Sequence, residues 1–160
     1  MKGWFGKGTL AAAVGCLTLG SAALAQAGSC SDASLKGKYG QNISGELLPG
    51  PGVVLAQNGV AMTTFNGHGE FSQVDFVVID GAPQSSTFQT ETGTYKVNSD
   101  CTGTATINYS DGSKIDLELV VVDQGREFRT VVSFLSMGGS AVPVNIGSSG
   151  VRVDNADGDF

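Results

Sequence analysis

The sequence is poor in the residues from which most catalytic and metal sites are built. It has one histidine, His68, and three cysteines among 160 residues. A zinc site takes roughly four Cys, His or acidic ligands. A Ser-His-Asp triad or a Cys-His dyad needs a histidine base held beside its nucleophile. His68 stands between glycines in Asn66-Gly67-His68-Gly69, where we expect a hairpin tip remote from a sheet interior. The composition therefore predicts no catalytic set, no metal and no cofactor.

Positive charge is scarce as well. Without residues 1–25 the chain has seven Lys and Arg against fifteen Asp and Glu, a net charge of −8. Proteins that bind nucleic acid or anionic lipid gather basic residues on one surface. Because no Lys/Arg cluster occurs in this chain, we expect no nucleic acid partner. A small-molecule ligand is the partner that these features leave open.

The N-terminus has the three parts of a secretory signal peptide. Lys2 and Lys7 form a short basic region, an uncharged apolar stretch runs from Leu10 to Leu24, and Ala23-Leu24-Ala25 is the small-x-small pattern of a cleavage site. We predict a signal peptide over residues 1–25 and one secreted domain, periplasmic or extracellular, over residues 26–160.

Two alternatives to cleavage remain. A membrane anchor would need an apolar span of ~20 residues, and this run is shorter and interrupted by Gly15 and Gly20. A lipoprotein would use Cys16, but Ala13 stands where a larger aliphatic residue is usual. We therefore expect no transmembrane span after cleavage; the sequence does not indicate the oligomeric state.

Two cysteines, Cys30 and Cys101, would survive cleavage. In an oxidising compartment a lone pair most simply forms one disulfide, here closing a loop of about 70 residues. A reactive cysteine would need a basic neighbour or a CxxC spacing, and Asp100 beside Cys101 has the wrong sign. The sequence therefore favours a structural disulfide.

Helical periodicity is absent, and turns divide the chain from end to end. Short runs rich in Val, Ile, Thr, Phe and Tyr alternate with Gly, Asn, Asp and Ser, which indicates antiparallel β-structure. We predict strands at 36–46, 56–65, 70–79, 87–97, 102–109, 114–122, 127–136 and 149–154, with irregular segments at 26–34 and 137–150. Eight short strands favour an all-β fold, an antiparallel up-and-down barrel that removes sheet edges, with a β-sandwich as the alternative.

Alternation predicts how two of these strands face. Along 114–122, Ile115, Leu117, Leu119 and Val121 share one face. Along 127–136, four residues share a face opposite Glu127 and Arg129, namely Phe128, Thr130, Val132 and Phe134.

Three motifs give the chain a family resemblance. They are Leu35-Lys36-Gly37-Lys38-Tyr39-Gly40, Phe65-Asn66-Gly67-His68-Gly69, and Gly93-Thr94-Tyr95-Lys96-Val97-Asn98-Ser99-Asp100-Cys101-Thr102-Gly103-Thr104. Over about residues 30–136 the chain resembles a group of small secreted bacterial proteins of mostly uncharacterised function. The resemblance implies a calycin-like barrel, similar in shape to that of allene oxide cyclase. The motifs lie at turns and strand starts, so they imply a fold and carry over neither catalytic residues nor the cyclase activity.

Polar residues within the predicted strands are the candidate ligand-binding residues. These are Tyr39, Gln41, Glu46, Asp75, Tyr95 and Arg129. Asp75 shares a face with Gln73 and Val77; in the lumen it would be desolvated, with a raised pKa as a general acid needs. A shift of one residue in register would turn it to solvent, and we favour the solvent-facing orientation. For the other five, a solvent-facing side chain or a cross-strand pair is the alternative.

At the C-terminus Asp154, Asp157 and Asp159 suggest calcium, but their spacing does not match the calcium-loop pattern, so we expect a solvated tail.

Three functions are compatible with these features. We favour a non-enzymatic secreted barrel that binds a small apolar or amphipathic ligand. The alternatives are a cyclase- or isomerase-type enzyme that uses a barrel pocket, and a surface or matrix structural or interaction protein. A lumen filled by the protein's own side chains would contradict the first.

Overall fold

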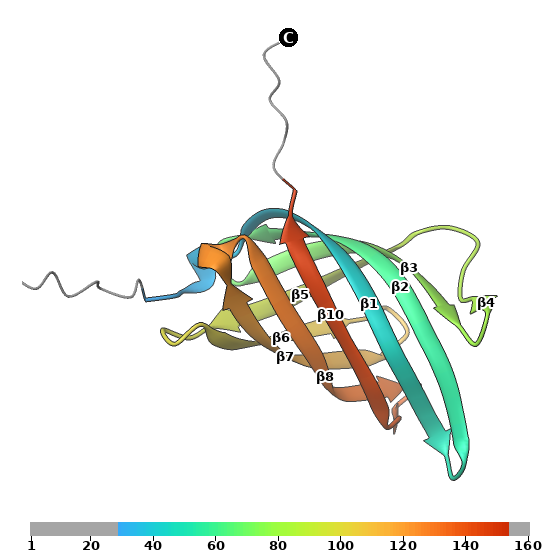
Figure 1. The fold of residues 1–160 in the computed structure, drawn as a ribbon. Coiled ribbons are helices and arrows are strands. Elements are labelled where there is room, and N and C mark those ends of the chain that lie inside the picture. The colour runs from blue at the N-terminus through green and yellow to red at the C-terminus, as the bar shows by residue number, and fades with distance from the viewer. Residues whose placement is uncertain (1–28, 154–160) are drawn as a thin grey trace, which may run out of the picture.

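Eight long antiparallel strands close into a barrel in the computed structural model, which describes residues 29–153 (Figure 1). They are β1 (Lys36–Gly50), β2 (Val53–Asn66), β3 (Glu70–Ile79), β5 (Gln89–Val97), β6 (Thr102–Asn108), β7 (Lys114–Val122), β8 (Glu127–Met137) and β10 (Val144–Arg152). Each pairs with the next long strand along the chain, and β10 pairs with both β8 and β1, which closes the ring. The predicted barrel is confirmed and the sandwich alternative is wrong.

Short elements complete the fold. Strand β4 (Ala82–Pro83) pairs with β3, strand β9 (Ser140–Ala141) pairs with β8, and the 3-10 helices are η1 (Asp32–Ser34) and η2 (Asp123–Gly125). None of the helices in residues 29–153 has the length and apolar character that a membrane-crossing helix needs. The predicted signal peptide, the alternative anchor at Cys16 and the tail carboxylates Asp154, Asp157 and Asp159 lie outside the described residues.

Two predictions about the strands are corrected by the structure. The segment 137–150, predicted to be irregular, contains β9 and the first residues of β10, because Val144 to Gly150 extend the pairing with β1. In β8 the register with β7 shifts between Val132 and Phe134, where Leu117 faces Val132 and Asp116 faces Phe134. This bulge at Ser133 turns Phe134 outward, so Leu135 takes the inward position that strict alternation gave to Phe134.

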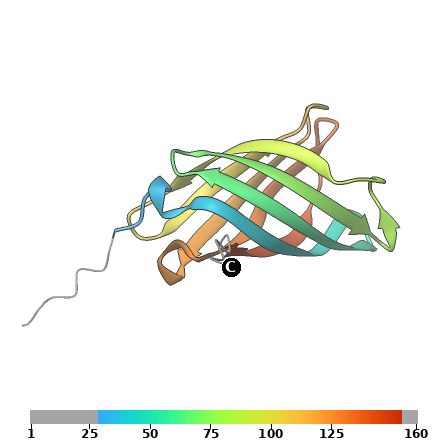
Figure 2. The same ribbon diagram turned by 90° about the horizontal axis from the view of Figure 1, so that it is seen from above.

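One end of the barrel is closed by aromatic side chains. Tyr39, Phe65, Phe71, Tyr95 and Phe128 form a buried cluster, in which the ring centroids of Phe65 and Tyr95 are 4.9 Å apart. Helices η1 and η2 lie at this end, as the view from above shows (Figure 2). The confirmed disulfide between Cys30 and Cys101 packs against the same cluster. The aromatic cluster therefore closes the barrel at the end where the disulfide joins the N-terminal segment to the β5–β6 turn.

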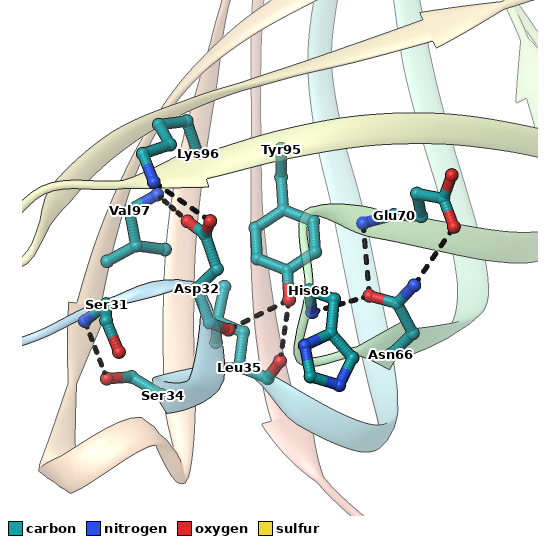
Figure 3. A network of polar contacts seen from close by, with 10 residues as sticks. All are labelled: Ser31, Asp32, Ser34, Leu35, Asn66, His68, Glu70, Tyr95, Lys96 and Val97. Carbon is teal, nitrogen blue, oxygen red and sulfur yellow. Dashed lines mark hydrogen bonds and ion pairs between the residues drawn. The ribbon is translucent and has the colours of Figure 1, made fainter.

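Hydrogen bonds fix η1 across this end (Figure 3). The Tyr95 hydroxyl donates to the carbonyl oxygens of Asp32 (2.8 Å) and Leu35 (2.9 Å). The Asp32 carboxylate accepts from the Val97 backbone N–H at 2.7 Å and pairs with Lys96 at 3.0 Å. The N-terminal segment is thereby held on β5 and seals the aromatic end of the lumen.

The opposite end carries the β1–β2 hairpin and the connections after β3, β6 and β8. Here a smaller apolar cluster joins Leu47, Leu135 and Ile146 on β1, β8 and β10. Partly buried side chains of other strands pack against this cluster, among them Ile79 on β3 and Ile115 on β7. These residues leave an unfilled cavity within the barrel.

Candidate functional site

A cavity of about 300 Å³ occupies the barrel between its two ends. The aromatic rings of Phe65, Phe71 and Phe128 form its floor. Residues at the open end, among them Gln84, Asp111 and Met137, line its mouth. Binding sites for small organic molecules begin at about this volume, and an interior this large is not filled by the protein's own side chains.

Most of the wall is aliphatic. The apolar wall residues come from six of the eight long strands: Ile43, Leu47, Val77, Ile79, Ala105, Ile107, Ile115, Leu117, Leu119, Val132, Leu135 and Ile146. Because a strand alternates its side chains between two faces, every second residue of these strands reaches the lumen. An apolar wall of this kind desolvates any polar group that lies in it.

A continuous chain of polar side chains crosses the middle of the cavity. Thr63 on β2 donates to Gln73 Oε1 on β3 at 2.7 Å, and Gln41 Nε2 on β1 donates to Thr63 Oγ1. Ser148 on β10 donates to Gln41 Oε1 at 3.2 Å and is hydrogen-bonded to Thr130 on β8 at 2.8 Å. These bonds fix the amide orientation of Gln41 and Gln73 within the lumen.

This row of hydrogen-bonded side chains ends at two buried carboxyl groups, those of Asp75 on β3 and Glu91 on β5, which we call the acid pair. Gln73 Nε2 donates to Asp75 Oδ2 and to Glu91 Oε2, each at 3.4 Å. Asp75 is 8% exposed and Glu91 is 7% exposed. They come together because Gln73 is the direct partner of Glu91 in the β3–β5 ladder, and Asp75 follows two residues later on the same face.

Burial changes the protonation of the acid pair. It raises the pKa of Asp75, and burial together with the neighbouring Asp75 charge raises the pKa of Glu91 to about 7. A hydrogen bond between the two carboxyl groups favours the proton on Glu91. Near neutral pH Glu91 therefore exchanges between its protonated and ionised forms beside Asp75.

Tyr109, just beyond the end of β6, also lines the cavity beside the acid pair. Burial, followed by the charges of Glu91 and Asp75, raises the pKa of its hydroxyl. The phenol therefore stays neutral and available as a hydrogen-bond donor.

Comparison with known proteins leaves the family open. No protein-family model matches the chain. None of the curated proteins matches it in sequence. In structure it is similar to the S-type phycobiliprotein lyase CPES from Guillardia theta, with a TM-score of 0.49 and 8% sequence identity over 78% of this chain and 91% of the lyase.

The six sequence-predicted site residues divide between the cavity and other places. Gln41 and Asp75 line the cavity, so the solvent-facing orientation favoured for Asp75 is wrong. Its strand faces inward because Phe71, on the same face, belongs to the aromatic floor.

The other four lie outside the cavity. Tyr39 and Tyr95 are buried in the aromatic cluster, where the Tyr39 hydroxyl donates to the Gly125 carbonyl. Glu46 is exposed on the outer face of β1. Arg129 is exposed on β8 and pairs with Glu127 at 3.0 Å. All four lie on strands, as predicted. The two tyrosines point into the barrel at its closed, aromatic end, whereas Glu46 and Arg129 point outward to solvent.

The sequence reasoning missed Glu91, which the structure places at the centre of the site. The sequence does contain a signal for Glu91. It lies an even number of residues from Tyr95 and Val97, so all three share one face of the strand, and all three are buried. An inward β5 face over Tyr95 and Val97 implies an inward Glu91. His68 is exposed on the β2–β3 turn, where its backbone N–H donates to Asn66 Oδ1 at 2.7 Å (Figure 3). Within residues 29–153 no three His, Cys, Asp or Glu side chains are grouped to hold a metal ion.

Proposed function

We propose that the protein is an exported barrel that binds a small amphipathic ligand in its lumen without transforming it. The observation that carries the proposal is the cavity of about 300 Å³, which has an aliphatic wall and a buried band of oriented polar side chains. An apolar pocket with a few fixed polar groups is typical of small-molecule sites. The polar band orients one end of a ligand, and the aliphatic wall contributes binding free energy through burial of its apolar part.

Export is the part of the proposal that rests on the sequence. The basic, apolar and small-x-small parts of residues 1–25 support it. The disulfide between Cys30 and Cys101 is consistent with an oxidising compartment.

Native mass spectrometry tests both parts in one experiment. The full chain is produced through a bacterial secretory route and purified from the periplasm or medium without detergent. We expect an N-terminus at Gln26, and a native mass that exceeds the denatured mass by that of one small molecule. Extraction and fragmentation of that molecule would then identify the ligand class.

Two results would contradict the proposal. An uncleaved chain retained in the cytoplasm would refute export. A bare native mass, together with no binding of a solvatochromic apolar dye, would refute the binding function. A dye is the suitable probe because the single Trp, Trp4, lies in the leader.

The acid pair supports a second candidate, an isomerase- or cyclase-type enzyme. A carboxyl group with a pKa of about 7 inside a largely apolar cavity is suited to donate a proton near neutral pH. An enzyme and a binding protein differ in what leaves the cavity. Ligands extracted from the wild type and from Glu91→Gln should be identical for a binding protein, and should differ in chromatographic retention for an isomerase.

A surface or interaction protein is the third candidate. Exposed apolar side chains do lie opposite one another on the outer faces of β2 and β3, where Met62 faces Val74. The closed ring of eight strands leaves no long edge for another chain to extend. A monodisperse monomer in sedimentation velocity would exclude self-association through this outer face.

A further inference from the structure

The charged residues that line the cavity all have the same sign. They are Asp75, Glu91 and Asp111, and no Lys, Arg or His among residues 29–153 lines it. The basic residues nearest in sequence are held elsewhere: Lys114 pairs with Asp116 at 2.8 Å, and Lys96 pairs with Asp32. The lumen therefore offers carboxylates without a cationic side chain to neutralise them.

The acids are confined to one side of the cavity. Asp75 and Glu91 lie on adjacent strands, β3 and β5, with Tyr109 beside them. Across the lumen the wall of β1, β8 and β10 carries the apolar cluster of Leu47, Leu135 and Ile146. A bound molecule would therefore meet carboxyl groups on one side, and on the other side this apolar cluster beside the uncharged polar groups of Gln41, Thr130 and Ser148.

We propose that the ligand of this cavity is a small amphipathic cation, such as an organic ammonium, whose head group pairs with Asp75 and Glu91 while its apolar part lies against Leu47, Leu135 and Ile146. This inference rests on the proposed binding function and names its ligand class.

The hydrogen bonds of the acid pair support this choice. Gln73 is the side chain that donates to both carboxyl groups, and it does so at 3.4 Å, the long end of hydrogen-bond distance. A carboxylate can accept about four hydrogen bonds, so both groups retain acceptor capacity toward the lumen. An ammonium group supplies hydrogen-bond donors for these free acceptor positions and a positive charge that compensates the carboxylates.

The same geometry disfavours the other classes of amphiphile. A carboxylate or phosphate head group would lie beside the acid pair with no cation between them, and like charges repel strongly in a low-dielectric interior. A neutral head group could accept the shared proton's hydrogen bond but would leave the negative charge uncompensated. The net charge of −8 outside residues 1–25 would also attract cations and repel anions during encounter.

Three probes of equal chain length test the inference: n-octylamine, octan-1-ol and octanoate. Each is titrated into the secreted, ligand-stripped protein at pH 7.5 by isothermal titration calorimetry. We expect octylamine to bind at least tenfold more tightly than octanol, and octanoate to bind most weakly. In the double variant Asp75→Asn/Glu91→Gln, octylamine affinity should fall at least tenfold, to the level of octanol.

A matched control removes an acid from the outside of the barrel. Glu118→Gln changes the exposed face of β7 and should leave all three affinities as in the wild type. Thermal unfolding followed by circular dichroism checks that the double variant is folded; its amide groups have the shape of the acids they replace.

The outcomes separate the two proposals. Binding of octanol or octanoate at least as tightly as octylamine would overturn the cation inference and leave the binding function standing. The inference would equally fail if the double variant kept its preference for octylamine. Failure of all three probes to bind the wild type would overturn both proposals.

Discussion

Glu91 shows how a single residue acquires a special role from its surroundings. It lies on β5, where Gln89, Gly93, Tyr95 and Val97 share its face of the strand. The one local signal in the sequence is that Glu91 alternates in step with Tyr95 and Val97, which are also buried. The special environment arises because Asp75 and Gln73 are brought beside it by the β3–β5 register, which a sequence without known pairing does not contain.

The raised pKa of Glu91 predicts that stability falls as the pH rises. The folded protein holds the proton up to about pH 7, whereas an unfolded glutamate loses it near 4.5. Between these values the folded state binds more protons, so the free energy of unfolding decreases with pH. Urea unfolding at pH 5 and pH 8 should show a decrease on the order of 1–3 kcal/mol.

Glu91→Gln should remove most of this decrease, and Glu118→Gln should retain it. The groups that face Glu91 are Asp75 and Tyr109, both with raised pKa values, and no basic side chain among residues 29–153 lines the cavity. Hydrogen bonds lower the pKa of Asp32, Asp100 and Asp111, so these groups titrate below the tested range. A wild-type stability that rises from pH 5 to pH 8 would contradict the assignment.

At the scale of elements, alternation predicted the faces of β7 and most of β8. Leu117 and Leu119 line the cavity as expected from the alternation around them. The prediction failed after Val132, because a bulge adds one residue to β8 and reverses every later side chain. No residue type at Ser133 distinguishes a bulge from regular strand, which explains why Phe134 was placed inward.

Gly93 shows that an element can require the absence of a side chain. It lies in β5 beneath the aromatic floor, where a Cβ would overlap the ring of Phe71 and the carbonyl oxygen of Thr106. The overlap with backbone cannot be relieved by a rotamer change. Gly93 therefore lets the Phe71 ring cross β5 and close the floor of the cavity.

We predict that Gly93→Ala destabilises the protein by about 1–3 kcal/mol through overpacking. Gly50→Ala is the matched control, because a Cβ there would meet nothing within 4 Å. Its effect should stay within about 0.5 kcal/mol. Denaturant unfolding of the two variants measures the difference in the free energy of unfolding. Equal values would contradict the prediction, because they would mean that the Phe71 ring moves aside without loss of stability.

For the whole molecule, the sequence predicted the strand number, the closed barrel and the disulfide. These follow from turn residues, alternation and a lone cysteine pair, which are local or compositional signals. The cavity and the acid pair depend on which residues of distant strands share the lumen, and only the folded barrel brings these together. The sequence therefore identified Gln41 as a candidate binding residue and left the orientation of Asp75 open. It did not predict that Glu91 lies beside Asp75.

The disulfide lies at the same end of the barrel as the aromatic cluster and joins two segments there covalently. It links Cys30, ahead of η1, to Cys101 in the β5–β6 turn, across a sequence separation of 71 residues. A loop of this length contributes roughly 4 kcal/mol in the chain-entropy model, because it restricts the unfolded chain. The bond lies at the closed end, away from the acid pair and the mouth of the cavity.

We therefore predict that Cys30→Ser/Cys101→Ser lowers the free energy of unfolding by about 4 kcal/mol while leaving octylamine affinity within twofold of the wild type. Equilibrium urea unfolding measures the first quantity, and calorimetric titration at a temperature where the variant is folded measures the second. Reduction of the wild-type disulfide should reproduce both values. A large loss of affinity in the folded variant would mean that the closed end shapes the cavity, whereas a small loss of stability would mean that η1 is held by the Tyr95 and Asp32 hydrogen bonds rather than by the covalent link.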